Sequence, residues 1–460
     1  MMTERSQNIV ILGAGLVGSL QALMLAQQGY QVRVYDKLPD IRRQSMSAGR
    51  SINLALASRG RHALAQAGVL EQTEALLIPM HGRMLHNQQG EQKLQRYGSR
   101  ETEAIYSVSR AGLVSLLRDE AEATGMVTFY FEHTCKNIDF IANRCQFNFQ
   151  DADLFIDFDY LLACDGAGSV ARGLMQQQTQ HPDDFSRELL DHAYKELHLP
   201  PDTKGDFQLP QNALHVWPRN DYMMIGLPNP GGDFTLTLFM PKTGPVSFAS
   251  IDSKEALHAL FDQQFADIKP LIRDLQVDYF NNPTGQLGTV RCRRWYQSNV
   301  LLLGDAAHAV VPFHAQGMNA GFEDCVAVMD VLHHNNHDWS VLFETVQMVR
   351  QDNTNAIADM SLENYIEMRA SVNDPQFHIK KQVAFALEQR WPDYFIPRYS
   401  MVMFHRVPYA EAYARGRVQA RLLEHLCRDI QSTDNIEFAI DFDHAERLIK
   451  GSLSPIVQVQ

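Results

Sequence analysis

The sequence has few cysteines, and none of the spacings that would make them ligands or a redox pair. Its six cysteines include no Cys-x-x-Cys pair, so neither a disulfide framework nor a thiolate metal site is expected. Three nearby histidines (333, 334 and 337) flank Asn335-Asn336, which signals a helix end and favours a solvated loop. We therefore predict no metal site and a cytoplasmic protein with reduced thiols.

Excess positive charge and long apolar runs are also missing. The chain has 41 Lys and Arg against 54 Asp and Glu, a formal net charge of −13, which argues against a nucleic-acid-binding surface and favours a small-molecule partner. Apolar runs end well short of the ~20 residues that a spanning helix needs. No signal segment precedes the first apolar run, and residues 452–460 are too short and polar for an anchor. We expect no membrane anchor.

Residues 8–18 are the most informative part of the chain. The apolar run Asn8–Leu12 is typical of a buried parallel strand, and it leads through Gly13, Gly15 and Gly18 into a segment of helical composition. In such a turn the first glycine permits the bend, the second lets a pyrophosphate approach and the third lets the helix lie close to the strand. This pattern predicts a dinucleotide-binding turn.

The segment that follows supports this interpretation. Gly29 closes the helix, and a second strand at residues 31–35 ends in Asp36, which is placed to accept ribose hydroxyls. Among the arginines of the polar stretch 37–50, Arg50 is the favoured partner for phosphate or for the adenine ribose. A solvated loop explains any single arginine equally well.

Two later strands end in the same kind of small-residue turn. One strand, at residues 160–164, leads into Asp165-Gly166, and another, at 299–303, leads into Gly304-Asp305. The helix expected from Gln316 offers a further N-terminus to an oxygen-rich ligand. A surface turn remains the alternative for Asp165, but three such strand ends in one chain favour one shared ligand site.

Other segments define the remaining elements. A helix is predicted from Arg110 to about Gly125, with Ser109 as its N-cap. Strand-like runs between residues 127 and 164 are interpreted as a small meander, and the β-rich region 182–278 as an antiparallel sheet. Helices are expected over 60–77, 355–372, 376–390 and 409–428.

Together, these three strand ends resemble the fingerprints of the single-component flavoprotein aromatic hydroxylases, and they occur in that family's order. Further blocks resemble the branch that acts on L-kynurenine, at residues 49–56, 212–218, 311–314, 362–368 and 395–401. The resemblance implies an α/β fold. It consists of a discontinuous Rossmann-like FAD-binding domain (1–78, 99–181 and 279–370), an inserted antiparallel β-sheet substrate domain (79–98 and 182–278) and a C-terminal helical region (371–460).

The resemblance also implies the chemistry. FAD would be the cofactor and NADPH the reductant, and O₂ would be activated as a flavin hydroperoxide that hydroxylates L-kynurenine to 3-hydroxykynurenine. His314 and Gln316 would lie near the reactive edge of the flavin, without an assigned proton transfer. The implied cofactor-binding residues are Gly13, Gly15, Leu16, Val17, Gly18, Asp36, Lys37, Arg50, Ala55, Arg110, Asp165, Asp305, Gly317, Met318 and Asn319.

Four residues are implied to hold the amino-acid end of the substrate: Arg83, Tyr97, Asn364 and Tyr399. A planar guanidinium can pair with a carboxylate through two hydrogen bonds, and two phenols and an amide can hold the other polar atoms. One rival interpretation is a related hydroxylase of a benzoate-like substrate. Another is a flavin redox sensor that hydroxylates nothing. Neither the oligomeric state nor the NADPH docking site follows from the sequence.

One position departs from the family pattern. Ala315 precedes Gln316-Gly317, where the family usually has glycine. If this position requires a positive φ, alanine costs about 1 kcal/mol or more. We therefore expect strain in this loop, with an effect on coupling rather than on cofactor binding.

Overall fold

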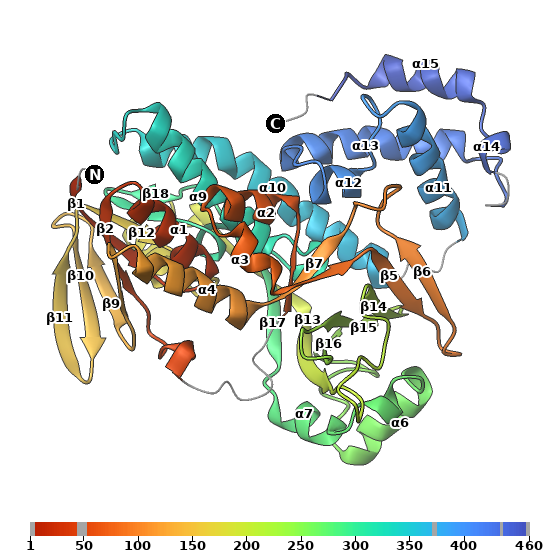
Figure 1. The fold of residues 1–460 in the computed structure, drawn as a ribbon, viewed down its shortest axis with the longest axis horizontal. Helices are drawn as coiled ribbons and strands as arrows, with labels where there is room; N and C mark the ends of the chain where they lie inside the picture. The colour runs from red at the N-terminus through yellow and green to blue at the C-terminus, as the bar shows by residue number, and fades with distance from the viewer. Residues whose placement is uncertain (1–4, 44–52, 370–374, 433–435, 457–460) are drawn as a thin grey trace. The chain divides into compact units, whose positions relative to one another are not determined.

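The computed structural model describes residues 5–43, 53–369, 375–432 and 436–456. They fall into two compact units. Unit 1 comprises Met1–Leu77, Val108–Leu190 and Leu287–Ala358, and unit 2 comprises Ile78–Ser107, Asp191–Gln286 and Asp359–Gln460. The chain therefore passes between the units several times (Figure 1).

Unit 1 is built on a six-stranded sheet in the order β18-β19-β12-β1-β2-β8. Its central strands are parallel, and most of their apolar side chains are buried, as their composition predicts. The strands are β1 (Arg5–Leu12), β2 (Tyr30–Tyr35), β8 (Val127–Tyr130), β12 (Tyr160–Ala163), β18 (Tyr296–Gln297) and β19 (Val300–Leu302).

The helices of unit 1 follow its strands. Ser109 caps α4 as predicted, its hydroxyl accepting a hydrogen bond from Gly112 N at 3.3 Å. The predicted helix at 60–77 is two helices, because Gly68 with φ +71° interrupts it. The helices are α1 (Leu16–Gln27), α2 (Ser58–Gln66), α3 (Leu70–Glu74), α4 (Arg110–Ala123), α5 (Val170–Gln178), α8 (Asp305–His308) and α9 (Gly317–His334).

The predicted meander between residues 127 and 164 is partly wrong. Its first and last strands, β8 and β12, belong to the six-stranded sheet. The antiparallel meander consists of β9 (Thr134–Asp139), β10 (Arg144–Phe149) and β11 (Ala152–Asp157). Local strand patterns look alike whichever sheet they join, because pairing partners are set by distant segments.

Unit 2 contains most of a seven-stranded sheet in the order β17-β13-β16-β15-β14-β5-β6. The expected antiparallel pairing is present between β13, β16, β15 and β14, and β5 and β6 form a hairpin. The strands are β5 (Gly82–His86), β6 (Gln92–Arg96), β13 (Phe185–Leu199), β14 (Leu214–Arg219), β15 (Tyr222–Pro228), β16 (Phe234–Pro241) and β17 (Gly285–Cys292). Short strands β3 (Asn53–Leu56), β4 (Leu77–Met80) and β7 (Ile105–Ser109) occur elsewhere.

The end of the region expected to be β-rich is helical instead. Helices α6 (Lys254–Gln264) and α7 (Leu275–Asn281) pack their apolar side chains against the sheet, where Leu257 and Phe261 are fully buried. Ser253 caps α6 and accepts a hydrogen bond from Ala256 N at 3.2 Å. This N-cap is the local signal that the strand interpretation overlooked.

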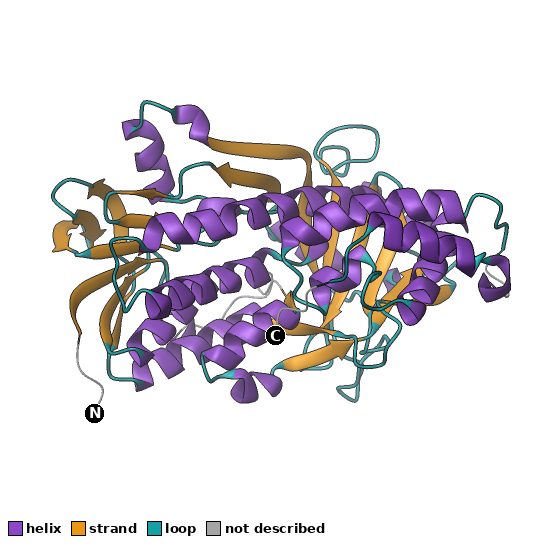
Figure 2. Cartoon of the chain, turned by 90° about the horizontal axis from the view of Figure 1, so that it is seen from above, coloured by secondary structure: helices purple, strands orange, loops and turns teal. Residues whose placement is uncertain are grey.

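The C-terminal part of unit 2 is helical, as predicted, and has its own apolar core around Val383, Leu387 and Ile449. Its helices are α11 (Pro375–Arg390), α12 (Arg398–Met403), α13 (Tyr409–Leu426), α14 (Ile436–Ala439) and α15 (Phe442–Ser452). The long helix α10 (Leu342–Arg369) begins in unit 1 and ends in unit 2. Helices and strands can be distinguished by colour in Figure 2.

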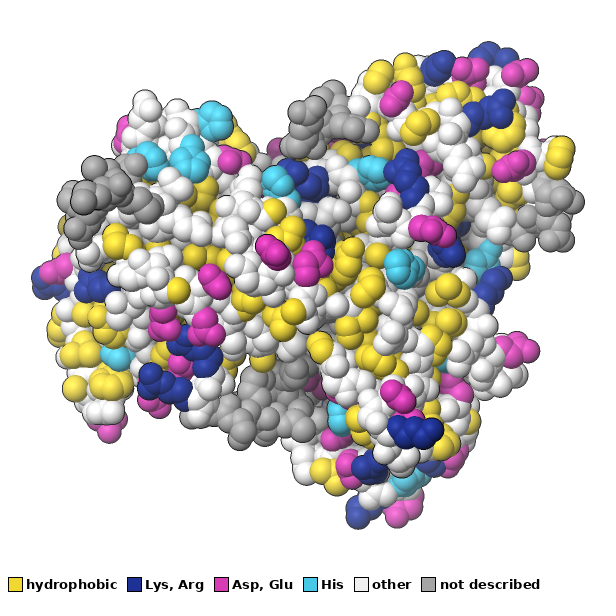
Figure 3. Space-filling model, viewed as in Figure 1, with side chains coloured by type: hydrophobic (Ala, Val, Ile, Leu, Met, Phe, Trp, Pro, Cys, Tyr) yellow, Lys and Arg dark blue, Asp and Glu magenta, His cyan; other side chains and the backbone are white. Residues whose placement is uncertain are grey.

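On the face drawn in Figure 3, acidic and basic side chains are interspersed and do not gather into a patch of one sign. Among the described helices, none is both long and apolar enough to span a bilayer.

Candidate active site

Three strand ends lie side by side at one edge of the unit 1 sheet. Leu12 pairs in register with Ala163, and Ala163 pairs in register with Leu302. Each strand is followed within three residues by a small-residue turn, at Gly13, Asp165 and Gly304. The predicted convergence of three distant motifs is confirmed, at the carboxyl edge where open α/β sheets bind ligands.

The glycine turn after β1 provides a direct test of whether a dinucleotide fits. Gly13 has φ +93°, and a Cβ there would lie 2.4 Å from Cys164 O. A Cβ on Gly18 would lie 1.9 Å from Gly13 O, whereas a Cβ on Gly15 would meet nothing within 4 Å. The first and third glycines are therefore needed for folding. The second leaves open space at the N-terminus of α1, as a bound pyrophosphate requires.

Asp36 holds the same turn from the end of β2. One carboxylate oxygen accepts a hydrogen bond from Ala14 N at 2.7 Å, and the other accepts one from Leu38 N at 2.8 Å. Each oxygen keeps a second lone pair. The carboxylate can therefore orient the turn and still accept hydrogen bonds from ribose hydroxyls.

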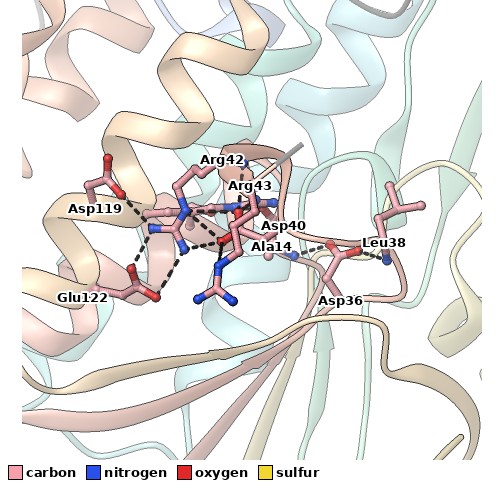
Figure 4. A network of polar contacts seen from close by, with 10 residues as sticks. Ala14, Asp36, Leu38, Asp40, Arg42, Arg43, Asp119 and Glu122 are labelled. Carbon is pink, nitrogen blue, oxygen red and sulfur yellow. Dashed lines mark hydrogen bonds and ion pairs between the residues drawn. The ribbon is translucent and has the colours of Figure 1, made fainter. Parts of the chain in front are cut away.

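A buried arginine that the sequence did not reveal stabilises the glycine turn after β1 through hydrogen bonds. Arg118 on α4 donates through Nε and Nη2 to Ala14 O, at 3.0 and 2.6 Å, and through Nη1 to Asp40 at 3.3 Å. Asp40 also pairs with Arg42 at 2.8 Å, which in turn contacts Asp119 and Glu122 (Figure 4). The Arg42 contacts keep the pKa of Asp40 below its usual range although burial opposes this.

At the second strand end, hydrogen bonds to the Asp165 side chain close the turn. One oxygen of Asp165 accepts hydrogen bonds from Val170 N at 2.7 Å and Ala171 N at 3.3 Å, while the other has no hydrogen-bond partner among the described residues. Burial raises the pKa of this carboxyl. Arg172 donates to Ala306 O at 2.7 Å and so ties the corner to the third strand end.

The third strand end is held by Asp324, a fully buried residue on α9 that was not predicted. Its oxygens accept hydrogen bonds from Gly304 N at 2.9 Å, His308 at 2.6 Å and Arg350 at 2.8 Å. These partners keep its pKa low despite burial. The positive φ of Gly304 (+59°) is thereby fixed, and Asp305 stands exposed at the start of α8.

The loop before α9 contains the predicted strain. Ala315 is left-handed, with φ 54° and ψ 34°, so the positive φ on which the expected strain depends is present, and the effect on coupling stays a prediction. Asn319 is fully buried and fixes the loop, donating to Ala315 O at 2.8 Å and to Ala55 O at 3.0 Å while accepting from Ala57 N at 2.9 Å. His314 and Gln316 on either side of Ala315 are also buried.

The other predicted cofactor residues occupy varied environments. Val17 lies next to the third strand end. A Cβ placed on Gly304 would be 3.0 Å from a methyl carbon of Val17. Arg110 and Lys37 are exposed, Leu16 and Ala55 are buried, and Gly317 and Met318 begin α9 half-buried. Arg50 lies outside the described residues.

A second group of predicted residues lies within unit 2. Arg83 on β5 is almost fully buried, and its guanidinium carbon lies 5.9 Å from the ring centre of Tyr97 and 5.3 Å from that of Tyr399. The two rings are stacked 5.4 Å apart at 17°. Residues far apart in the sequence thus form one cation–aromatic cluster.

The electrostatics of this cluster favour an anionic ligand. Arg83 Nε has no hydrogen-bond partner among the described residues, and the guanidinium reaches Glu367 only at 3.9 Å. Burial opposes its charge, but Tyr399, Tyr97 and Glu367 together raise its pKa. Burial raises the pKa of both phenols, well above 10 for Tyr97. The phenols therefore stay protonated and can act as donors.

Two further residues, Asn364 and Lys381, are related to this cluster through Glu367 and Arg83. Asn364, buried on α10, lies three residues before Glu367 and so on the same face of the helix. Lys381 on α11, which the sequence did not single out, donates to Arg96 O at 2.8 Å. Burial, together with the charge of Arg83, lowers the pKa of Lys381 to about 7. No local motif marks Lys381, because its partners come from other elements.

Comparisons with known proteins agree with this architecture. The FAD binding domain family matches residues 6–341. The kynurenine 3-monooxygenase of Stenotrophomonas maltophilia (strain K279a) is 44% identical over 442 residues, covering 95% of this chain and 96% of that protein. The kynurenine 3-monooxygenase of Xanthomonas oryzae pv. oryzae (strain MAFF 311018) is 43% identical over 98% of both.

Among solved structures, the tetrameric form of 2-methyl-3-hydroxypyridine-5-carboxylic acid oxygenase superposes with a TM-score of 0.63 at 18% identity, covering 81% of this chain and 95% of that one. This likeness shows the fold. The family match and the near full-length relatives show more: the chain belongs to the kynurenine 3-monooxygenase family of FAD-binding proteins.

Proposed function

We propose that this chain hydroxylates L-kynurenine to 3-hydroxykynurenine, consuming NADPH and O₂ and releasing NADP⁺ and water. Family membership supports the reaction class. The observation that carries the substrate assignment is Arg83, a buried cation without a bidentate acid partner among the described residues. A buried charge whose acid partner lies as far away as 3.9 Å is costly, and a ligand carboxylate in closer, bidentate contact would reduce that cost.

The binding step follows from this geometry. The guanidinium of Arg83 pairs with the carboxylate of the substrate, and the protonated phenols of Tyr97 and Tyr399 donate to the same oxygens. Asn364 and Glu367 share one face of α10. They provide an amide and a carboxylate suited to the α-ammonium group of an amino acid, which a benzoate lacks.

The cofactor site is proposed in unit 1. The backbone N–H groups at the start of α1 would hold the pyrophosphate, and the Asp36 carboxylate would accept hydrogen bonds from the ribose hydroxyls. Asp305 and the N-terminus of α9 would contact the remaining polar atoms of FAD. Bound there, FAD would supply the redox chemistry, because it can accept electrons from NADPH and activate O₂. The buried side chains of His314 and Gln316 in the loop before α9, and of Asn319 in the first turn of α9, would limit the access of water.

Substrate-stimulated NADPH oxidation tests this function. L-Kynurenine should accelerate NADPH oxidation by the FAD-loaded protein and yield 3-hydroxykynurenine, whereas 4-hydroxybenzoate should do neither. Stimulation and hydroxylation by the benzoate instead would move the chain to the rival hydroxylase class. A flavin-bearing protein that neither compound stimulates would favour a redox sensor and overturn the proposal.

Arg83→Ala tests the substrate site separately. Loss of the buried charged contact should weaken kynurenine binding by about 2 kcal/mol or more, measured by titrating the flavin spectrum. The exposed, ion-paired Arg144 on β10 provides a matched control, because Arg144→Ala should leave the dissociation constant unchanged. Equal affinity in Arg83→Ala and wild type would remove Arg83 from the substrate site.

A further inference from the structure

Three side chains in unit 2, none of them assigned to substrate, bring potential metal-ligand atoms together. They are Glu103 before β7, Glu388 on α11 and His405 after α12, and their ligand atoms lie within 4.8 Å of one another. His405 Nε2 is 3.5 Å from Glu103 Oε1 and 4.0 Å from Glu388 Oε1. Because they are separated by hundreds of residues or lie on different elements, sequence spacing gives no sign of this cluster.

The cluster is incompletely satisfied by the described residues. The side chain of Glu388 is fully buried, and its Oε1 has no hydrogen-bond partner there. His405 Nε2, which faces both carboxylates, likewise has none. The side chain of Glu103 is 5% exposed and that of His405 19%, so the two buried acid side chains share a space that the imidazole borders. Buried ionisable groups of this kind need a counter-charge.

Arg100 provides only part of that charge. Its guanidinium lies 3.4 Å from Glu103 and 3.8 Å from Glu388, and its side chain is 46% exposed. The longer of these contacts is an ion pair without a hydrogen bond. Arg100 can therefore move into solvent without losing a well-formed bidentate pair with Glu388.

We propose that Glu103, Glu388 and His405 form a binding site for a divalent cation of the zinc class. One imidazole nitrogen and two carboxylate oxygens are ligands that Zn²⁺ accepts, with water in the fourth position. Tetrahedral bonds of about 2.1 Å place ligand atoms about 3.4 Å apart. The two separations from His405, 3.5 and 4.0 Å, and the separation between the carboxylates, at most 4.8 Å, require side-chain adjustments of about 1.5 Å or less to reach that value.

The position of the site gives it a structural consequence. Glu103 follows Tyr97 by six residues, and His405 follows Tyr399 by six. A cation bound here would cross-link the two segments that carry the stacked phenols to α11, which carries Lys381. Metal binding would then stabilise unit 2 in the conformation that holds Arg83 beside the two stacked rings.

Calorimetric titration of the FAD-loaded, full-length protein with Zn²⁺ after chelator treatment tests the site. The exposed pair His425 and His444, with their Nε2 atoms 3.1 Å apart, is a second place where zinc can bind. The titrations therefore use the His425→Gln/His444→Gln background. One equivalent should bind and raise the melting temperature.

Variants distinguish a metal site from a simple ion-pair cluster. Glu388→Gln should weaken Zn²⁺ binding roughly ten- to a hundredfold, whereas Glu446→Gln, at an exposed ion pair on α15, should not change it. Arg100→Gln should tighten binding, because it removes the cation that competes for the same carboxylates. No saturable binding in the His425→Gln/His444→Gln background, or weaker binding in Arg100→Gln, would overturn the proposal. The Zn²⁺ titration of Arg100→Gln tests the proposal even if Glu388→Gln does not fold.

Discussion

At the scale of single residues, Gly13, Gly15 and Gly18 lie in one turn but are required for different reasons. Gly13 and Gly18 are closed in by backbone atoms, and Gly15 faces open space with φ −73°. An alanine is therefore compatible with the folded chain at position 15 only. The glycine spacing predicted this division, because the motif itself encodes close approaches along a short stretch.

Gly15→Ala should separate folding from cofactor binding. The free energy of unfolding of the FAD-free protein should change by no more than about 0.5 kcal/mol. FAD affinity should fall roughly a hundredfold, since the added methyl group occupies the place of the pyrophosphate. Denaturant unfolding and flavin fluorescence titration measure the two effects. Gly18→Ala is the contrasting variant and should unfold the turn, so equal stability losses in both would contradict this assignment.

Lys381 shows what the sequence could not reveal at this scale. Its pKa of about 7 arises from burial and from Arg83 on another element. The residues next to Lys381 in the sequence therefore give no sign of the lowered pKa. The motif residues Asp36 and Asp165 were predictable because their hydrogen bonds lie within or beside the turn that each one closes. A lysine at the end of a long-range contact has no such local signature.

Kynurenine affinity should depend on the protonation of Lys381. Below pH of about 7 the ammonium adds a second positive charge beside Arg83, and above it this charge is lost, so affinity should fall as the pH rises through 7. The decrease should be roughly tenfold, or about 1.4 kcal/mol. Binding titrations at several pH values measure it, and Lys381→Met should abolish the dependence. A wild-type affinity that is constant across this range would contradict the prediction.

At the scale of elements, the three strand ends were predicted well because each carries its own turn chemistry. Ser109 as an N-cap was likewise predictable from local rules, whereas the strain at Ala315 was expected from a departure from the family pattern. Helices α6 and α7 were misassigned to the β-rich region, although the Ser253 N-cap is a local signal for α6. Strands β8 and β12 were misassigned to the meander because their sheet partners are distant in sequence. The supports beneath the turns, Arg118 and Asp324, were missed for the same reason.

Arg118→Met tests how far one helix supports the turn on another element. The substitution keeps most of the side-chain volume but removes the hydrogen bonds to Ala14 O and Asp40. Loss of these buried contacts should lower the free energy of unfolding by about 2 to 3 kcal/mol and also weaken FAD binding. Urea unfolding provides the measurement. Arg144→Gln, which breaks an exposed ion pair, should cost less than about 1 kcal/mol, and similar losses in the two variants would refute a supporting role for Arg118.

At the scale of the whole molecule, a buried histidine network predicts how stability responds to acid. His215 Nδ1 lies 2.9 Å from His86 Nε2, and His86 contacts Asp267 at 3.0 Å. Burial lowers the pKa of His215 to about 4, with smaller effects from Pro210 and His86. Asp267 has a lowered pKa that burial opposes and its His86 and Trp217 hydrogen bonds maintain.

The folded protein should therefore lose stability as the pH falls from about 6.5 towards 4. In this window the unfolded chain protonates position 215 and the folded chain does not, so His215 can account for up to about 3 kcal/mol. Urea unfolding near neutral pH and near pH 4.5 should show a smaller loss in His215→Gln than in wild type. His198, whose pKa is raised by its hydrogen bond to Asp233, has the opposite sign, so a His198→Gln control should show a larger acid loss.

The described residues proposed to bind FAD all lie in unit 1. Those proposed to bind the amino-acid group of the substrate all lie in unit 2. Specificity and cofactor chemistry are thus encoded in different sets of segments. Variation in the second set can change which aromatic compound is accepted while the glycine turn and its supports remain intact. A directed search for new substrates should therefore randomise positions around Arg83 and Tyr399, and flavin content would then report folding independently of the altered preference.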